Sequence, residues 1–362
     1  MNILIVSGAF APQISPRSFR TTELVRELCA QGHQVTLYIP DTGDNRTELA
    51  KQYGFTLKYY ERPQDRYSSS KNKFIFCFGR FLVYYCAYPM CLLLKYLRKE
   101  LEKEKGQYDL LISIAAPHAI HWTIGLMYAK GHRLAKRWVA DCGDPFMLSG
   151  TSNHWHPFYL RQFEKRWCRL CDYITVPTPG AVNGYYPEFR DKIRVLPQAF
   201  NFDEVVRDEY HPHSVPTFAY SGSIWKGSKD PRLFLDYLCD LQADFRFYVY
   251  TNDLAAVQPY RKRLGEKLIV SSYIPRLELL RKLSTMDFLV HFEFQTSVQT
   301  PSKLIDYALS GRPILPINVQ NMDHGLIDEF LHGDYTRQHR VENLEQYDIH
   351  NVARKFLELA EL

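Results

Sequence analysis

A Thr-Pro-Ser-Lys run at the start of an apolar segment is the clearest chemical signal in the chain of 362 residues. Thr300 and Pro301 suit the N-cap and the first position of a helix. Free N–H groups at such a helix start, together with the ammonium group of Lys303, attract an anion. Asp306 follows Ser302 by four residues, so its carboxylate shares a helix face with that hydroxyl and can accept bonds from a polyol. The run predicts a nucleotide-sugar site; the alternative is a capped core helix whose Lys and Asp are only solvated.

A second candidate phosphate site follows the predicted strand 218–220. Gly222 and Ser223 are small enough for the backbone to approach a ligand closely, and Lys226 can pair with a diphosphate. The alternative is an ordinary turn from a strand to a helix. The loop favours a diphosphate site in the second half of the chain.

The first half carries guanidinium groups at a predicted helix start. Ser15 suits the N-cap and Pro16 the first helical position, while Arg17 and Arg20 are either anion contacts or solvated surface side chains. The preceding loop, 7–12, has neither the G-x-G-x-x-G fingerprint nor the G-x-x-x-x-G-K-[ST] motif. The sequence therefore disfavours a dinucleotide dehydrogenase and a P-loop NTPase.

These candidate sites follow strands in a regular alternation of strands and helices. The candidate strands are 3–6, 35–39, 109–114, 137–141, 173–176 and 193–196, then 218–220, 245–250, 268–270, 288–290 and 314–317. Such alternation predicts parallel sheets covered on both faces by helices, with ligands bound beyond the carboxyl ends of the strands. A polar, proline-containing stretch at 203–216 marks a boundary, so we expect α/β domains at 1–200 and 201–362. The last helix is free to pack back on the first domain.

One segment, 74–94, departs from this pattern. It is almost entirely apolar and aromatic, is interrupted by Arg80 and Pro89, and has basic residues on both sides. Its uncharged part is shorter than the roughly 20 residues of a membrane span. The sequence leaves two interpretations, a buried core helix and a helix at an anionic membrane surface.

Composition narrows the class of protein. The net charge of +5 is too small for a dedicated nucleic-acid binder. The apolar start lacks the features of a secretory signal, and the eight cysteines are scattered, so we expect a cytoplasmic protein with reduced thiols. Cys168 and Cys171 form a C-x-x-C without a second ligand pair, which argues against zinc or redox chemistry there.

The chain resembles the family 4 retaining glycosyltransferases of the GT-B fold over nearly its whole length. The passages that carry the resemblance are Gly32-His33-Gln34-Val35-Thr36, Asp141-Cys142-Gly143-Asp144-Pro145, Ser221-Gly222-Ser223 with Lys226-Gly227, and Pro301-Ser302-Lys303-Leu304-Ile305-Asp306-Tyr307 with Gly311-Arg312-Pro313-Ile314. The resemblance implies two Rossmann-like doubly wound domains facing across a cleft. It also implies that Lys226, Ser302 and Lys303 hold the donor diphosphate, and that Asp306 holds the ribose.

The chain departs from the family pattern at several positions. Val298 stands where the first of the family's two glutamates is expected, and Asp306 stands for the second. Ser223 occupies the place of a family arginine, and Ser15 with its following proline replaces a glycine pair. The diphosphate is therefore expected to depend on Arg17, Lys303 and backbone N–H groups. Tyr273 and Ile274 match the place where the family holds the base.

On the acceptor side, the resemblance points to the loop after strand 109–114. Similar enzymes carry a cleft histidine there, so we favour His118, with His121 second. An isolated histidine at a strand end is otherwise more often structural. Asp144, which follows strand 137–141, is either an orienting group for an acceptor hydroxyl or a cap of the next turn.

The expected activity is transfer of a sugar, with retention, from a UDP- or GDP-sugar to a hydroxyl of a saccharide or lipid-linked saccharide. No Asp-x-Asp sequence is present, so we expect neither a metal nor another cofactor, and catalysis through His118, Lys226 and Lys303. The segment 74–94 suggests surface polysaccharide, O-antigen or glycolipid assembly at the inner face of the cytoplasmic membrane. The alternatives are a nucleotide-sugar 2-epimerase, a catalytically inactive relative and a sugar-binding protein without activity.

Overall fold

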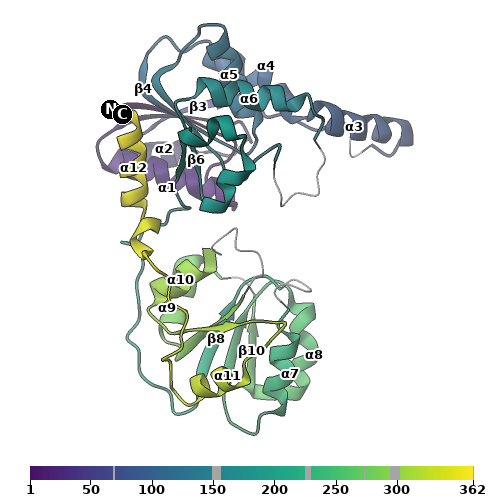
Figure 1. Cartoon of the computed structure of the whole chain (residues 1–362), viewed down its shortest axis with the longest axis vertical. Coiled ribbons are helices and arrows are strands. Elements are labelled where there is room, and N and C mark those ends of the chain that lie inside the picture. The colour runs from purple at the N-terminus through teal and green to yellow at the C-terminus, as the bar shows by residue number, and fades with distance from the viewer. Residues whose placement is uncertain (68–69, 149–155, 225–229, 273, 294–301, 362) are drawn as a thin grey trace. The chain divides into compact units, whose positions relative to one another are not determined.

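Two compact units make up the chain. The computed structural model describes all residues except 68–69, 149–155, 225–229, 273, 294–301 and 362. The first unit comprises Met1–Phe200 together with Gln346–Leu362, and the second comprises Asn201–Glu345. The last helix of the chain thus belongs to the first unit, although the second unit precedes it in sequence (Figure 1).

The first unit is built on a seven-stranded sheet whose neighbouring strands are all parallel. In sheet order the strands are β3 (Thr56–Tyr60), β2 (Gln34–Pro40), β1 (Asn2–Ser7), β4 (Tyr108–Ile114), β5 (Ala135–Asp141), β6 (Tyr173–Val176) and β7 (Ile193–Val195). The chain reverses its direction of winding between β1 and β4. Their carboxyl ends therefore form the crevice where sheets of this kind bind ligands.

Helices cover both faces of this sheet, as expected for parallel strands buried on both sides. The helices of the unit are α1 (Pro16–Ala30), α2 (Thr47–Tyr53), α3 (Lys73–Cys86), α4 (Leu93–Leu101), α5 (Ala119–Ala129), α6 (Leu160–Leu170) and α12 (Ile349–Glu361), of which α3 does not cover the sheet. The apolar sides of α1 and α12 pack with one face of the sheet, and those of α4, α5 and α6 pack with the other.

The second unit repeats this plan with a five-stranded parallel sheet. In sheet order its strands are β10 (Leu268–Ser271), β9 (Arg246–Tyr250), β8 (Thr217–Ser221), β11 (Phe288–Phe292) and β12 (Ile314–Ile317). Its helices are α7 (Arg232–Asp240), α8 (Leu254–Leu264), α9 (Arg276–Ser284), α10 (Ser302–Ser310) and α11 (His324–Leu331). The helices α7, α8 and α11 pack on one face and α9 and α10 on the other, so the switch point lies between β8 and β11.

Local sequence signals account for many element ends. The Ser15 hydroxyl oxygen caps α1 by accepting a bond from the Ser18 N–H at 3.1 Å. Gly32 and Gly311 follow α1 and α10 with φ of +84° and +76°, a conformation that glycine adopts without strain. Every strand expected from the sequence is present, which confirms the prediction of parallel α/β sheets; β3 was not predicted.

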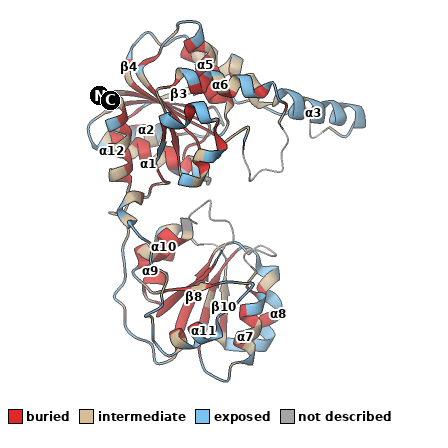
Figure 2. Ribbon diagram, viewed as in Figure 1, coloured by how far each residue is buried: buried red, intermediate tan, exposed pale blue. Residues whose placement is uncertain are grey.

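The apolar segment 74–94 is not one helix, and only its C-terminal part packs with the core. It forms α3, a 3₁₀ turn at Met90–Leu92 and the start of α4, with the break near Pro89. The leucines of α4 are buried, whereas α3 extends away from the sheet and is exposed along its length (Figures 1 and 2). No described helix is by itself long and apolar enough to cross a membrane; Lys73–Cys86 and Met90–Leu101 pass that test only as a pair bent by 61°.

Candidate functional site

A small cavity of about 180 Å³ lies at the carboxyl ends of β8 and β9 in the second unit. It collects four residues that the sequence assigned to the donor, namely Gly222, Ser223, Ile274 and Lys303. Its other lining residues are Ser221, Tyr250, Thr251, Asn252 and Leu279. Small residues, backbone groups and one ammonium group therefore meet at the place where a doubly wound sheet binds its ligand.

Two tyrosines hold the loop after β8 in place. The hydroxyl of buried Tyr307 accepts a bond from the Ser221 N–H at 2.7 Å and lies 3.2 Å from the Ser221 carbonyl oxygen. The Tyr220 hydroxyl donates to the Ser223 carbonyl at 2.8 Å. A Cβ on Gly222 would lie only 2.8 Å from the Tyr220 hydroxyl, so the loop needs a glycine at this position.

The carboxylate of Asp306 is buried and paired. Its oxygens lie 2.8 Å from Arg276 Nε and 3.4 Å from Lys303 Nζ. Lys303 is about one-third exposed, so its ammonium group is accessible to a ligand in the cavity while it offsets part of the Asp306 charge. Contact of Asp306 with a ribose stays a prediction, because both carboxylate oxygens already have cationic partners in this structure.

Several predicted donor residues cannot be placed. Lys226, Tyr273, Thr300 and Pro301 lie outside the described residues. Ser302 is the first described residue of α10, and its side chain is also outside the description. The assignment of these five residues to the donor therefore stays a prediction.

In the first unit, a buried ion pair lies beneath the switch point. Arg20 Nη2 donates to Asp141 Oδ1 at 2.9 Å and Arg20 Nε to Oδ2 at 3.3 Å, while Thr175 donates to Oδ1 at 2.7 Å. Burial opposes ionisation of Asp141, but Arg20, Arg17 and Thr175 together outweigh it and lower its pKa. Arg20 is 2% exposed, so its interpretation as an anion contact was wrong: it is a structural counter-ion.

Arg17 has a more accessible place beside the same carboxylate. Its Nη1 lies 3.5 Å from Asp141 Oδ2, and its side chain keeps 19% of its exposure. Burial lowers its pKa, and the Asp141 charge opposes that shift. The guanidinium also packs against Gly143, where a Cβ would lie 3.0 Å from Arg17 Cζ. Arg17 thus forms part of the surface at the carboxyl end of β5.

His118 lies at the start of α5 with an unused ring nitrogen. Its Nδ1 is buried and has no hydrogen-bond partner among the described residues, while the ring bonds to the backbone of Asp144. Burial lowers the pKa of His118 to about 4, and the nearby Arg17 charge adds to the effect. The imidazole is therefore neutral near pH 7. Asp144 itself is exposed on the adjacent loop.

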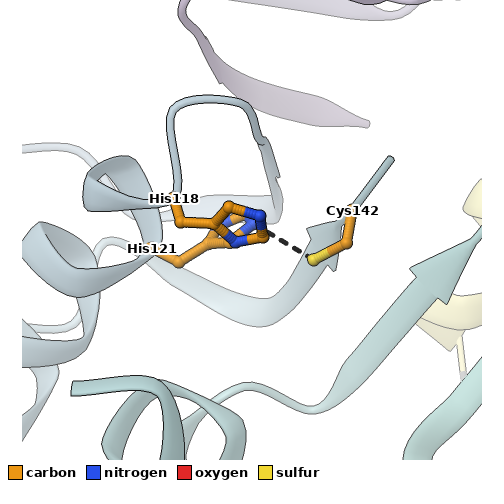
Figure 3. A group of neighbouring side chains, drawn as sticks. All are labelled: His118, His121 and Cys142. Atoms are coloured by element: carbon orange, nitrogen blue, oxygen red, sulfur yellow. Dashed lines mark hydrogen bonds between the residues drawn. The ribbon is translucent and has the colours of Figure 1, made fainter. Parts of the chain in front are cut away.

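His121 has a different role from the one predicted. It is fully buried, with Nδ1 2.8 Å from Ser113 Oγ and Nε2 3.4 Å from Cys142 Sγ (Figure 3). Ser113 also accepts a bond from Trp138 Nε1 at 2.8 Å. Burial lowers the pKa of His121 to about 3. The prediction of His121 as an acceptor contact was wrong, because both ring nitrogens have partners inside the core.

His118, His121 and Cys142 form a group whose donor atoms all lie within 4.8 Å of one another (Figure 3). Histidine and cysteine are ligands that Zn²⁺ accepts. The contact between His121 and Cys142 is explained by a hydrogen bond, so we assign no ion to the group.

A larger cavity, of about 580 Å³, opens beside the loop that carries His118. Its lining comes from β1, β2 and β3 loops and from the start of α4: Gly8, Pro12, Gln13, Pro40, Thr42, Asp44, Arg46, Tyr60, Arg62, Pro63, Met90, Leu93 and Pro117. Gly8 allows the β1 and β4 loops to meet, since a Cβ there would lie 2.4 Å from Pro117 Cδ. The cavity offers arginines and apolar side chains to a ligand.

The sequence-based search missed several of these residues. Arg276, the main partner of Asp306, follows a proline at a helix start, a signal that marks the helix but not the ion pair. Arg46 and Arg62 come from irregular polar stretches with no motif. Thr251 and Asn252 directly follow β9, so strand-end position alone could have suggested them.

Two doubly wound α/β units in one chain are the architecture of the GT-B fold. Residues 19–204, 186 of the 362, match the sequence model described as Glycosyltransferase Family 4. The chain belongs to this family and is a glycosyltransferase, an enzyme that transfers a sugar from a nucleotide-sugar. A search among curated proteins found no match.

Solved structures confirm the fold. The chain is similar to a glycosyltransferase from Rickettsia africae, with a TM-score of 0.65, 12% identity, and coverage of 99% of this chain and 98% of the other. It is also similar to the lipopolysaccharide outer core galactosyltransferase WaaB, with a TM-score of 0.60, 12% identity and full coverage of both chains. HepE from Anabaena, solved with UDP and glucose, gives a TM-score of 0.57 at 10% identity, again with full coverage of both.

Proposed function

We propose that the enzyme binds a UDP- or GDP-sugar in the second unit and transfers its sugar, with retention, to a hydroxyl of an acceptor held by the first unit. The observation that carries the donor assignment is the cavity beyond β8 and β9, where Gly222, Ser223, Ile274 and Lys303 meet. HepE, which has the same fold, was solved with UDP and glucose, and this supports a uridine nucleotide.

The diphosphate would bind between the ammonium group of Lys303 and the N-terminus of α10, with Lys226 as a second cation. Thr300 and Ser302 would supply backbone N–H groups there, and Pro301 would fix the helix start. Tyr273 and Ile274 would contact the base. As the glycosidic bond breaks, negative charge develops on the diphosphate, and fixed cations stabilise it without a metal or other cofactor. Asp306 keeps Lys303 in position through its 3.4 Å contact.

The acceptor hydroxyl would lie near His118. The neutral imidazole ring of His118 can contact that hydroxyl and orient its oxygen, and Asp144 on the adjoining loop would orient the sugar. In a front-side mechanism the departing phosphate oxygen takes the acceptor proton. No carboxylate nucleophile is then required, and His118 acts mainly by positioning.

For the acceptor we propose a saccharide or lipid-linked saccharide used in surface polysaccharide, O-antigen or glycolipid assembly. The 580 Å³ cavity is large enough for a sugar and lies next to His118 through Pro117. The exposed guanidinium group of Arg62 suits a phosphate-bearing acceptor, and Met90 adds an apolar edge. WaaB, which acts on the lipopolysaccharide outer core, shares the fold and supports this class.

Thermal-shift screening tests the donor site. Purified enzyme is heated with UDP, GDP, ADP, CMP and their sugar conjugates in the presence of EDTA. We expect one nucleoside diphosphate to raise the melting temperature, because a ligand that binds only the folded state stabilises it. The shift should be lost in Lys303→Ala and kept in Lys282→Ala, a control whose lysine is about half exposed in α9. An equal shift in both variants would contradict the assignment.

An epimerase of the same fold would convert the donor without any acceptor, and an inactive relative would bind it without turnover. Incubating the stabilising donor with enzyme and analysing the sugar by NMR separates these alternatives. Family membership favours transfer.

A further inference from the structure

Helix α3 is an apolar helix with almost no cover. Eight of its large apolar side chains are between 39% and 87% exposed: Phe74, Ile75, Phe76, Phe78, Phe81, Val83, Tyr84 and Tyr85. Gly79 is its one buried residue, and all its residues are described. The long exposed helix projects from the body of the first unit (Figures 1 and 2). Monomeric water-soluble surfaces rarely carry so large an apolar patch, so α3 is expected to have an occupant around it.

The exposed apolar residues are not confined to one side of α3. Phe74, Ile75 and Phe76 are consecutive, so they point in three directions around the helix axis. A helix that is apolar all round is normally buried in a protein core or in lipid. A helix that lies flat on a membrane has instead one strongly polar face. Apart from Arg80, the pattern on α3 therefore favours apolar surroundings.

Helix α3 is too short to span a bilayer. Its 14 residues are about 21 Å long, whereas the hydrocarbon core of a bilayer is about 30 Å thick. At the C-terminal end of α3, which joins the body of the unit, the chain bends by 61° into the second helix of the pair. The side chains of Leu93, Leu97 and Leu101 in that helix are buried in the core of the unit. Since α4 is fixed to the protein, α3 can enter a membrane from one side and cannot leave on the other.

The positive charge around α3 favours a membrane that contains anionic lipid. Between residues 66 and 99 there is no Asp or Glu, but there are seven basic residues: Arg66, Lys71, Lys73, Arg80, Lys95, Arg98 and Lys99. A basic residue next to an anionic membrane surface strengthens binding about fivefold. A second copy of the chain is a poorer occupant, because a two-fold interface through α3 would place two sets of these positive charges together.

The root of α3 is held firmly enough to orient it. The Tyr88 hydroxyl donates to the Gln64 carbonyl at 2.9 Å and accepts from the Arg66 N–H at 3.2 Å. The Tyr159 hydroxyl donates to the carbonyl of Tyr85. Next along the chain, Met90 and Leu93 line the 580 Å³ cavity. If α3 is inserted in a membrane, the lipid around it would thus lie close to the mouth of this cavity.

We propose that α3 inserts into a single leaflet of a membrane rich in anionic lipid and anchors the first unit there. Insertion brings the cavity beside α4 to the lipid headgroups, where a lipid-linked acceptor is presented. The insertion itself does not depend on the proposed function. The assignment of the cavity to a lipid-linked acceptor does rest on the proposed function.

Vesicle flotation of the full chain, without donor or acceptor, tests the docking. We expect binding to phosphatidylcholine vesicles that contain phosphatidylglycerol, weaker binding to phosphatidylcholine alone, and residual binding in 1 M salt, where charges are screened within about 3 Å. Phe74→Ser with Phe81→Ser should lower the partition coefficient about a hundredfold. The control, Leu233→Ser with Leu254→Ser, changes exposed leucines of the second unit and should leave it unchanged.

Insertion is measured with a reporter in α3, which has no tryptophan of its own. Fluorescence of Phe76→Trp, minus that of the parent, should shift to the blue on vesicles and be quenched by lipids brominated along the acyl chain. Binding without quenching, or binding abolished by salt, would overturn insertion in favour of surface attachment. Absence of binding, with a dimer in light scattering that Phe74→Ser with Phe81→Ser dissociates, would assign α3 to a second copy. None of these results affects the thermal-shift test of the donor site.

Discussion

At the scale of single residues, Glu164 is the most unusual carboxyl group in the first unit. It is fully buried in α6, its Oε1 accepts a bond from the Met147 N–H at 3.4 Å, and its Oε2 has no hydrogen-bond partner among the described residues. Burial raises the pKa of Glu164 to about 7 from an ordinary 4.5. The loop that follows Asp144 therefore depends on a carboxyl group that changes charge near neutrality.

This shift predicts a pH dependence of stability. Between pH 4.5 and 7 the folded protein holds a proton on Glu164 that the unfolded chain has released, so stability falls as pH rises through this window, by up to about 3 kcal/mol. Glu164→Gln removes the effect. The free energy of unfolding of this variant, relative to wild type, should rise between pH 5 and 8 in urea titrations.

The matched control is Glu188→Gln, whose exposed carboxylate pairs with Lys165 at 2.6 Å and has a lowered pKa. The Glu188 carboxylate is ionised above pH 5 in both the folded and the unfolded protein. The free energy of unfolding of Glu188→Gln, relative to wild type, should therefore not depend on pH in this range. A pH-independent difference for Glu164→Gln as well would show that its pKa is not raised.

A second residue-scale prediction concerns Gly8. The Cβ of alanine there would meet Pro117 Cδ at 2.4 Å and the Ala116 carbonyl oxygen at 2.8 Å. Moving this backbone should cost about 1–3 kcal/mol and displace the start of α5, which carries His118. Urea unfolding of Gly8→Ala should show the loss. Gly106→Ala, where a Cβ meets nothing within 4 Å, should be near neutral; equal stability of the two variants would contradict the packing.

At the scale of elements, the bond between α10 and the end of β8 supports the donor cavity. Tyr307→Phe removes the hydroxyl that accepts from the Ser221 N–H at 2.7 Å and leaves that buried group unpaired. We expect a loss of about 1–3 kcal/mol in stability and weaker donor binding, measured by unfolding and calorimetry. Tyr335→Phe, at a half-buried tyrosine of the second unit, is the control. Unchanged stability and affinity in Tyr307→Phe would show that this bond does not position the loop.

Elements with strong local signals were predictable from sequence, and those with weak signals were not. The first strand and its helix were predictable because Ser15 and Pro16 mark the helix start and Gly32 its end. The strand β3 (Thr56–Tyr60) was missed because it lies at the sheet edge and is only half-buried, so its hydrophobic pattern is weak. Exposure of α3 could not be predicted, since composition does not distinguish a core helix from one buried in lipid.

The candidate sites were predictable to a similar extent. Gly222, Ser223 and Lys303 could be grouped because each follows a strand or begins a helix, and the cavity brings them together. Pairing of Asp306 with Arg276, 30 residues away, depends on helix packing and carries no sequence signal. His121 was misassigned because motif position does not determine which way a helical side chain points.

At the scale of the whole molecule, the proposed function divides the transfer reaction between the two doubly wound units. The second unit carries the donor cavity, and the first carries His118, the larger cavity and α3. The chain returns to the first unit through α12, whose Val352 and Phe356 are fully buried there. Each unit thus has its own core and its own candidate site, and the proposed transfer uses both.

Proton NMR of a donor sugar during turnover tests the central claim most directly. The donor selected by thermal shift is incubated with enzyme and a hydroxyl acceptor, or with water as a slow acceptor, and the anomeric signals are followed. The account predicts release of the nucleoside diphosphate and a product whose anomeric configuration equals that of the donor. An inverted product, a donor converted at C2 without transfer, or a donor that stays intact in the presence of acceptor would contradict it.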